Sequence, residues 1–163
     1  MDADRKVAPL KALQGMVWKL GYESGGLIGH VYEDVLPFIR RAKVPASIYS
    51  SGSVEAQRLL FGHTSEGSVL DLFTSHFDTT NAGSKVDAAS YIAIARALNV
   101  DPGEILFVTD NIKEAEAAKS VGVLCAVSVR PGTAPLPADA RDRFAIVTSF
   151  DELDALLNQT KSL

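Results

Sequence analysis

The chain has 163 residues, of which 47% are hydrophobic and 22% are charged, a composition typical of a single soluble globular domain. Its formal net charge of -4 argues against the broad basic face of a generic nucleic-acid binder. No apolar stretch approaches the ~20 residues of a membrane span, the first residues lack the apolar segment of a secretory signal, and the single cysteine excludes an intrachain disulfide. We therefore predict a cytoplasmic protein that binds neither nucleic acid nor membrane.

Hydrophobic periodicity predicts helices and strands that alternate along the chain. Apolar residues recur at three- and four-residue steps over residues 8–20, which indicates a helix with one apolar face that ends at Gly21. Asp34 is placed to cap a second helix. A buried strand is expected over residues 44–49, and Ser53 is the predicted N-cap of the helix that follows it.

The second half of the chain continues this alternation. Ser149 and Glu152 have capping-box spacing ahead of a last helix. The pattern as a whole implies an α/β fold, with a Rossmann-like, mostly parallel sheet and helices on both of its faces. Before that last helix we expect a short helical piece over residues 68–73 and a short strand over residues 76–79. A helix over residues 85–98, a strand over 105–108 and a helix over 112–121 should follow. Two strands, over residues 123–129 and 145–148, complete the pattern.

Polar groups follow the predicted strand ends or open predicted helices, where the ligand crevice of such a sheet lies. Ser50 and Ser51 end the first strand, ahead of a helix start whose free amides and dipole suit an anion. Lys85 opens a helix after a glycine loop, and Asp110 ends a later strand. These groups suit a small phosphorylated ligand with Mg²⁺. The hydroxyls can donate to phosphate oxygens, the ammonium can offset the charge of those oxygens, and the carboxylate can hold the metal.

Each of these residues also has an ordinary structural interpretation. The two serines can form a polar turn, Asp110 can cap its own helix, and lysines are commonly solvated. Cys125 lies in a predicted strand and is interpreted as a small core residue. Arg130, at the end of that strand, is either an anion contact near the crevice or a solvated loop residue. Three histidines lack metal-ligand spacing and are interpreted as surface or packing residues: His30, His63 and His76.

A series of motifs spans nearly the whole chain, in the order Y-S-S-G-S-V-E-A-Q, H-F-D-T-T, G-S-K-V, I-L-F-V-T-D-N-I-K-E-A, V-S-V-R-P-G and T-S-F-D-E-L. This series strongly resembles acireductone synthase, the enolase-phosphatase of methionine salvage in the haloacid-dehalogenase-like superfamily. The upstream L-Q-G-M-V-W-K-L-G-Y-E-S-G is similar to the link between cap and core in that family.

The resemblance implies an activity and a set of site residues. Members of the family enolise a diketo alkylthio pentyl phosphate and then remove its phosphate to give acireductone, using Mg²⁺. The matching positions imply that Ser50 and Ser51 bind the substrate phosphate. By the same match, Lys85 stabilises phosphate and nucleophile, and Asp110 is a metal ligand. Glu114 resembles an accessory acidic position that orients the metal shell.

The chain departs from the family pattern at the nucleophile. In the family an N-terminal strand leads into a D-x-E-G-T motif whose first aspartate attacks phosphorus, and no such motif occurs in these residues. Asp2 and Asp4 have the spacing of its two acids, but no apolar strand precedes them, so we interpret them as a false match. We expect a chain that lacks the first strand and most of the cap, with residues 1–30 as a remnant of cap and link and residues 31–163 as the core domain.

In the family the first strand lies at the centre of the sheet, between the strands expected here over residues 44–49 and 105–109. Its absence predicts exposed backbone edges, so the chain rearranges to close the gap, self-associates to complete the sheet or is marginally stable.

Three functions stay open: an enolase-phosphatase completed by sequence outside these residues, a non-catalytic phosphate-binding relative that modulates a full-length copy, and a Rossmann-like nucleotide binder. The third is disfavoured because no G-x-G-x-x-G follows a strand.

Overall fold

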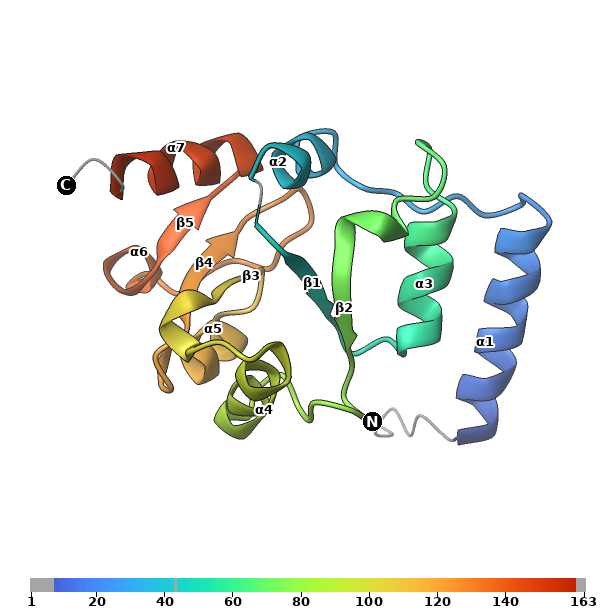
Figure 1. Cartoon of the computed structure of the whole chain (residues 1–163), viewed down its shortest axis with the longest axis horizontal. Helices are drawn as coiled ribbons and strands as arrows, with labels where there is room; N and C mark the ends of the chain where they lie inside the picture. Colours follow the sequence, from blue (N-terminus) through green and yellow to red (C-terminus); the bar gives the residue numbers. More distant parts are fainter. Residues whose placement is uncertain (1–7, 43, 161–163) are drawn as a thin grey trace.

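The computed structural model describes residues 8–42 and 44–160 of the chain. Within these residues the helices are α1 (Ala8–Glu23), α2 (Val35–Ala42), α3 (Val54–Gly62), α4 (Ala88–Leu98), α5 (Ile112–Lys119), α6 (Ala140–Arg143) and α7 (Phe150–Thr160) (Figure 1). The strands are β1 (Ala46–Tyr49), β2 (Phe73–Phe77), β3 (Leu106–Thr109), β4 (Leu124–Ser128) and β5 (Ala145–Val147), and two 3-10 turns cover Leu70–Leu72 and Pro102–Glu104.

The strands form two separate parallel sheets. β1 pairs with β2, and β3, β4 and β5 form a sheet in that order. The predicted parallel α/β architecture is therefore confirmed, but in the described part of the chain no backbone ladder joins β1 to β3. Side chains cross between these two strands instead, and the rings of Tyr49 and Phe107 lie 6.3 Å apart. Each of the two strands keeps one edge outside the observed ladders.

Helices cover both faces of the three-stranded sheet. Its first face packs against α2 and α7, and its second face packs against α4 and α5. Leu106 and Val108 of β3 contact the first group while Phe107 contacts the second, as the two-residue period of a strand requires. β4 is paired on both sides, and its residues Ala126 and Val127 are buried.

Helix α2 connects the hydrophobic cores of the two sheets. Phe38 belongs to the core of the three-stranded sheet, Leu36 belongs to the core around β1 and β2, and Ile39 packs against both. On the opposite side, the ring of Tyr91 lies 5.7 Å from Tyr49 of β1 and 5.1 Å from Phe107 of β3. The two sheets are thus held together by side chains above and below the space between β1 and β3.

Several predicted helix starts and ends differ from the structure because side chains have other partners. Helix α4 begins at Ala88 with Asp87 as its N-cap, so Lys85 lies in the preceding turn and does not open the helix. The Asp34 carboxylate does not cap α2 but accepts hydrogen bonds from Arg130 and Phe150. Helix α1 continues past Gly21 to Glu23. The strand expected over residues 76–79 is β2, Phe73–Phe77.

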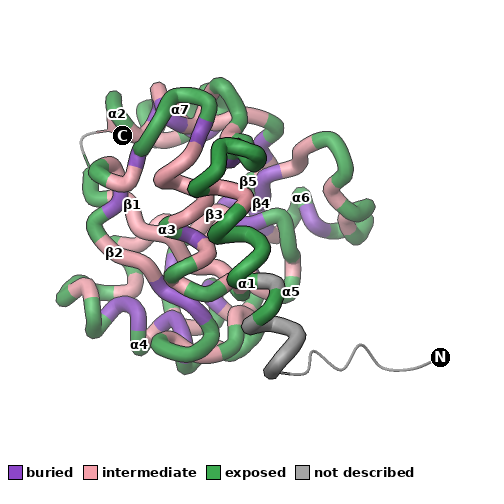
Figure 2. Tube along the Cα trace, turned by 90° about the vertical axis from the view of Figure 1, so that its right-hand side faces the viewer, coloured by how far each residue is buried: buried purple, intermediate pink, exposed green. Residues whose placement is uncertain are grey.

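The apolar face predicted for the first helix is not buried. Leu13, Val17 and Leu20 are 53%, 57% and 67% exposed, and the coloured part of the α1 tube is mostly green in Figure 2, the colour of exposed residues. The helix packs against α3, and Tyr22 near its end lies 5.5 Å from the ring of His63. Helical periodicity was sufficient to predict α1, but the face that it marks has no covering element among the described residues.

No helix in residues 8–42 and 44–160 is long and apolar enough to cross a membrane.

Candidate active site

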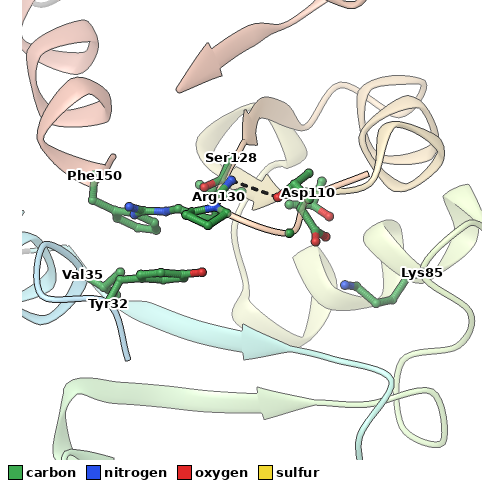
Figure 3. A pocket seen from close by; sticks show the side chains of 12 residues that line it. Tyr32, Val35, Lys85, Asp110, Ser128, Arg130 and Phe150 are labelled. Carbon is green, nitrogen blue, oxygen red and sulfur yellow. Dashed lines mark hydrogen bonds between the residues drawn. The ribbon is translucent and has the colours of Figure 1, made fainter. Parts of the chain in front are cut away.

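A pocket of about 480 Å³ lies at the carboxyl ends of β3 and β4. Thr109 and Asp110 line it after β3, Ser128 and Arg130 line it after β4, and Lys85 reaches it from the turn before α4. Figure 3 shows the Lys85 ammonium pointing into the pocket from one side and the Tyr32 hydroxyl pointing into it from the other. The structure therefore brings two of the predicted site residues, Lys85 and Asp110, to one cavity.

Lys85 is fixed by contacts on its side chain and on its backbone. Its Nζ lies 2.7 Å from Oε2 of Glu114 and 5.8 and 5.7 Å from the ring centroids of Tyr49 and Phe107. Burial raises the pKa of the Tyr91 phenol, so this hydroxyl stays protonated and donates a 2.6 Å hydrogen bond to the Lys85 carbonyl. The ammonium is thus aimed at the pocket by a preformed turn.

Glu114 pairs with Lys85 through its Oε2 atom. Its Oε2 also accepts a 2.7 Å hydrogen bond from the Thr109 hydroxyl, and that hydroxyl accepts one from the Asn111 amide. Glu114 is absent from the residues that line the pocket. Its predicted role as an accessory to the metal shell stays untested, while its contact with Lys85 is a role that the sequence did not indicate.

Asp110 is available for a ligand. Helix α5 is capped by Asn111, whose side chain accepts from the Lys113 amide, so the alternative in which Asp110 caps this helix is wrong. No hydrogen bond or ion pair within the described residues engages the Asp110 carboxylate, which is exposed at the pocket. Mg²⁺ in phosphoryl-transfer sites is commonly held by one or two carboxylates, waters and substrate phosphate, so Asp110 fits the ion as one of its ligands.

The described residues hold no cluster of three or more histidine, cysteine, aspartate or glutamate side chains suited to a metal. This distribution agrees with the sequence, in which the two acids of D-x-E-G-T do not occur. One carboxylate fits a Mg²⁺ ion only together with oxygen ligands from substrate or from further sequence.

Ser50 and Ser51 stand at the end of β1 but do not line the pocket. The Ser50 amide donates to the Phe77 carbonyl, its hydroxyl accepts from the Gly52 amide, and Ser51 is exposed. Ser50 directly follows Tyr49, whose ring is in contact with the Lys85 ammonium. Their role in phosphate binding stays a prediction.

The start of α3 is already occupied by a carboxylate of the chain itself. Asp78, 7% exposed, accepts hydrogen bonds from the amides of Val54, Thr80 and Asn81. Burial raises the pKa of this carboxyl, but the three amide donors outweigh burial and hold the pKa below its usual value. The expected anion site at this turn is therefore partly filled by Asp78, which the sequence reading missed.

The far wall of the pocket is built around an ion pair between Arg130 and Asp34. Both side chains are largely buried, 16% and 15% exposed, and the Asp34 carboxylate also accepts from the Phe150 amide. Burial raises the pKa of Asp34, but the hydrogen bonds from Arg130 and Phe150 hold it below its usual value. Of the two interpretations left open for Arg130, the solvated loop residue is wrong, because the side chain is largely buried and paired with Asp34; its contact with an anion stays a prediction.

The remaining candidates are structural, as expected. The His76 ring contacts the Gln57 amide oxygen at 3.1 Å, and burial lowers the pKa of this histidine below its usual value. His63 contacts the Leu59 carbonyl, and its ring lies at a tilt against that of Tyr22. Burial raises the pKa of Cys125 to about 11, which makes its thiol unreactive at neutral pH. Asp2 and Asp4 lie outside the described residues.

Comparison with known proteins places this chain in a family. The family model of haloacid dehalogenase-like hydrolases matches residues 10–122. The chain belongs to the haloacid dehalogenase-like hydrolases. Its sequence is 50% identical to enolase-phosphatase E1 of Danio rerio, over 97% of this chain and 61% of the relative. It is 47% identical to enolase-phosphatase E1 of Chaetomium globosum, over 94% of this chain and 69% of the relative. These relatives confirm the resemblance that the motifs indicated.

A solved structure shares this haloacid dehalogenase-like fold. The UTR4 protein of Saccharomyces cerevisiae superimposes with a TM-score of 0.83 and 37% sequence identity, over 91% of this chain and 68% of that chain. The chain spans 61%, 62% and 60% of the length of the first three curated relatives. Those longer proteins contain sequence that these 163 residues do not match.

Proposed function

We propose that this chain carries the phosphate- and metal-binding half of a Mg²⁺-dependent enolase-phosphatase of methionine salvage. The substrate is a diketo alkylthio pentyl phosphate, the class that the family resemblance implies. The observation that carries the proposal is the meeting of Lys85 and Asp110 in one pocket of a chain about half identical to named enolase-phosphatases. An ammonium from the turn before α4 and an unengaged carboxylate at the end of β3 suit a phosphate and a divalent cation.

Each site residue has a distinct role in this proposal. Lys85 binds the phosphate, and Glu114 keeps the ammonium directed at the pocket through their 2.7 Å contact. Asp110 is a ligand of Mg²⁺, which when bound neutralises phosphate charge. Ser50 and Ser51 donate hydrogen bonds to phosphate oxygens from the end of β1. The pocket lies beyond the carboxyl ends of parallel strands, the usual position of a ligand crevice in this fold.

Hydrolysis requires a nucleophile that these 163 residues do not supply in the family's motif. One edge of β1 and one edge of β3 are paired with no strand of the described residues, which supports the idea that one further parallel strand fits between the two sheets. Such a strand would end beside Lys85 and Asp110, where a carboxylate can attack phosphorus. We therefore expect phosphate release by this chain alone to be absent or very slow.

The test is Mg²⁺-dependent phosphate release, with Asp110→Asn in parallel. The 163-residue chain is assayed alone and after mixing with the segment of the Danio rerio relative that lies outside the match. We expect no release by the chain alone and release by the mixture that falls by roughly 10²-fold or more in Asp110→Asn and in Lys85→Met. Release by the chain alone that disappears in Asp110→Asn would place a nucleophile within these residues and contradict the proposal.

A second candidate is a non-catalytic, phosphate-binding modulator of a full-length copy. It is favoured by the absence of a three-ligand metal cluster in the described residues. The mixing experiment separates the two functions, because a modulator binds inorganic phosphate while its mixture with the missing segment stays inactive. A separate experiment tests self-association. If copies of the chain complete the sheet for one another, sedimentation of the chain alone should show a dimer or larger species, and a strict monomer would contradict this expectation.

A further inference from the structure

Tyr32 presents a hydroxyl to the pocket from the side opposite Lys85 (Figure 3). We propose that Tyr32, held in place by Arg130, binds the carbonyl-bearing part of the phosphorylated substrate while Lys85 binds its phosphate. This inference rests on the proposed function and adds to it a residue that selects among phosphate esters. Tyr32 is a binding residue in this arrangement, and Arg130 is a positioning residue that acts through it.

The Tyr32 ring is held on two sides although its hydroxyl is free. The Arg130 guanidinium carbon lies 4.5 Å from the ring centroid, and the ring of His30 meets it edge-on at 5.3 Å and 84°. Tyr32 remains 39% exposed, and within the described residues its hydroxyl has no hydrogen-bond partner. An ordered aromatic ring with an unused hydroxyl in a pocket is suited to donate a hydrogen bond to a ligand.

Arg130 is itself rigid, which makes it an effective support. Its guanidinium is paired with Asp34 and lies 5.8 Å from the ring centroid of Phe150. Its backbone amide donates to the Thr133 hydroxyl. The planar guanidinium fits flat against an aromatic ring in a way that a lysine ammonium does not. Its positive charge also favours partial negative charge on a ligand oxygen bound at the Tyr32 hydroxyl.

The pocket has room for both ends of such a ligand. Its volume of about 480 Å³ lies within the range of small-molecule sites. A phosphate at Lys85 directs the rest of the molecule across the pocket toward Tyr32 and Arg130 (Figure 3). The ligand class that fits is a phosphate monoester with a carbonyl oxygen a few bonds from the phosphate.

Binding by the full chain tests the inference without requiring catalysis. Three probes are titrated by calorimetry: hydroxyacetone phosphate, n-propyl phosphate, which lacks its carbonyl, and inorganic phosphate. We expect hydroxyacetone phosphate to bind about threefold to tenfold more tightly than n-propyl phosphate, the contribution of one hydrogen bond. Tyr32→Phe should abolish this difference and leave the affinity for inorganic phosphate unchanged. Tyr22→Phe, a matched variant at a ring that contacts His63, should keep the difference.

Arg130→Lys tests the positioning role. This variant retains a positive charge beside Asp34 but loses the planar face under Tyr32, so it should lose the carbonyl preference to the same degree as Tyr32→Phe. The double variant should lose no more than either single variant, because both remove one interaction. A merely structural role for Arg130 would lower thermal stability and leave the preference intact.

The outcomes separate this inference from the proposed function. If the carbonyl preference persists in Tyr32→Phe, or is absent from the unmodified chain while all three phosphates bind, the role of Tyr32 is overturned and the phosphate site stands. If no probe binds, or if Lys85→Met binds all three as well as the unmodified chain, the phosphate site and this inference fall together.

Discussion

The Lys85 ammonium and the Glu114 carboxylate are 2.7 Å apart at the edge of the pocket, and their side chains are only 21% and 12% exposed. Neither charge is well hydrated, so each depends on the other. Thr109 supplies a further hydrogen bond to the same carboxylate oxygen. The pair thus holds the lysine side chain in place at a site where an isolated ammonium would be costly to bury.

Removal of this pair should reveal strong coupling. A double-mutant cycle with Lys85→Met and Glu114→Gln is expected to give a coupling free energy of about 1–3 kcal/mol in urea unfolding. The exposed pair of Lys19 and Glu23, 4.0 Å apart with both side chains 53% exposed, is the control and should give less than about 0.5 kcal/mol. Equal coupling free energies in the two cycles would show that burial does not strengthen the Lys85–Glu114 ion pair.

The ion pair of Asp34 predicts a defined dependence of stability on pH. Because the pKa of Asp34 is lowered in the folded state, this group stabilises the fold above the unfolded pKa of about 3.9. The stabilisation is lost as the pH falls through the lower folded pKa. Urea unfolding should therefore show Asp34→Asn less stable than the unmodified chain at pH 7, with the difference shrinking between about pH 5 and pH 3. The neighbouring exposed Glu33→Gln should not show this convergence.

Asp78 should be one of the most sensitive polar positions in the fold. Asp78→Ala removes the acceptor of three amide hydrogen bonds at a site that is 7% exposed, and we expect a loss of about 2–4 kcal/mol in the free energy of unfolding. Asp87→Ala, which removes the N-cap of α4, should cost only about 1 kcal/mol. Similar losses of unfolding free energy for both variants would contradict the claim that Asp78 contributes more to stability than an ordinary N-cap.

Gly83 is required by the turn that presents Lys85. Its φ is +103°, and an added Cβ would lie 2.5 Å from the Ser90 hydroxyl. Gly83→Ala should therefore destabilise the fold by about 1–3 kcal/mol and weaken phosphate binding at Lys85, as measured by urea unfolding and calorimetry. Gly15→Ala, inside α1 with no described atom within 4 Å of the new Cβ, should instead stabilise by about 0.5–1 kcal/mol. A neutral Gly83→Ala would show that the turn tolerates a side chain.

Local sequence patterns predicted the features that depend on neighbouring residues. Ser53 is the N-cap of α3, as its position before an amphipathic segment indicated. The Ser149 hydroxyl accepts from the Glu152 amide as the capping box requires, although the Glu152 carboxylate returns to the Thr148 amide instead of the Ser149 amide. Lys85 and Asp110 were found because glycine loops and strand ends are local signals, and both lie in the pocket.

The features that the sequence did not reveal depend on residues far apart in the chain. Asp34 is a good helix cap by local criteria, but its partners Arg130 and Phe150 are 96 and 116 residues away. Asp78 meets Val54 across 24 residues. Asn111 and Asp110 are both suitable caps for α5, and only the backbone geometry decides for Asn111. Charged residues with several chemically reasonable partners are therefore where a single sequence is least informative.

The separation of the two sheets has a consequence for how the molecule opens. A two-stranded sheet has little stability by itself, so β1 and β2 should form a unit that unfolds locally while β3, β4 and β5 stay protected from hydrogen exchange. Helix α2 and the Tyr91 ring are the contacts that couple these units. Because the Lys85 ammonium lies against the Tyr49 ring of β1, a ligand that orders Lys85 at the pocket would stabilise this contact between the two units and raise the cooperativity of their unfolding.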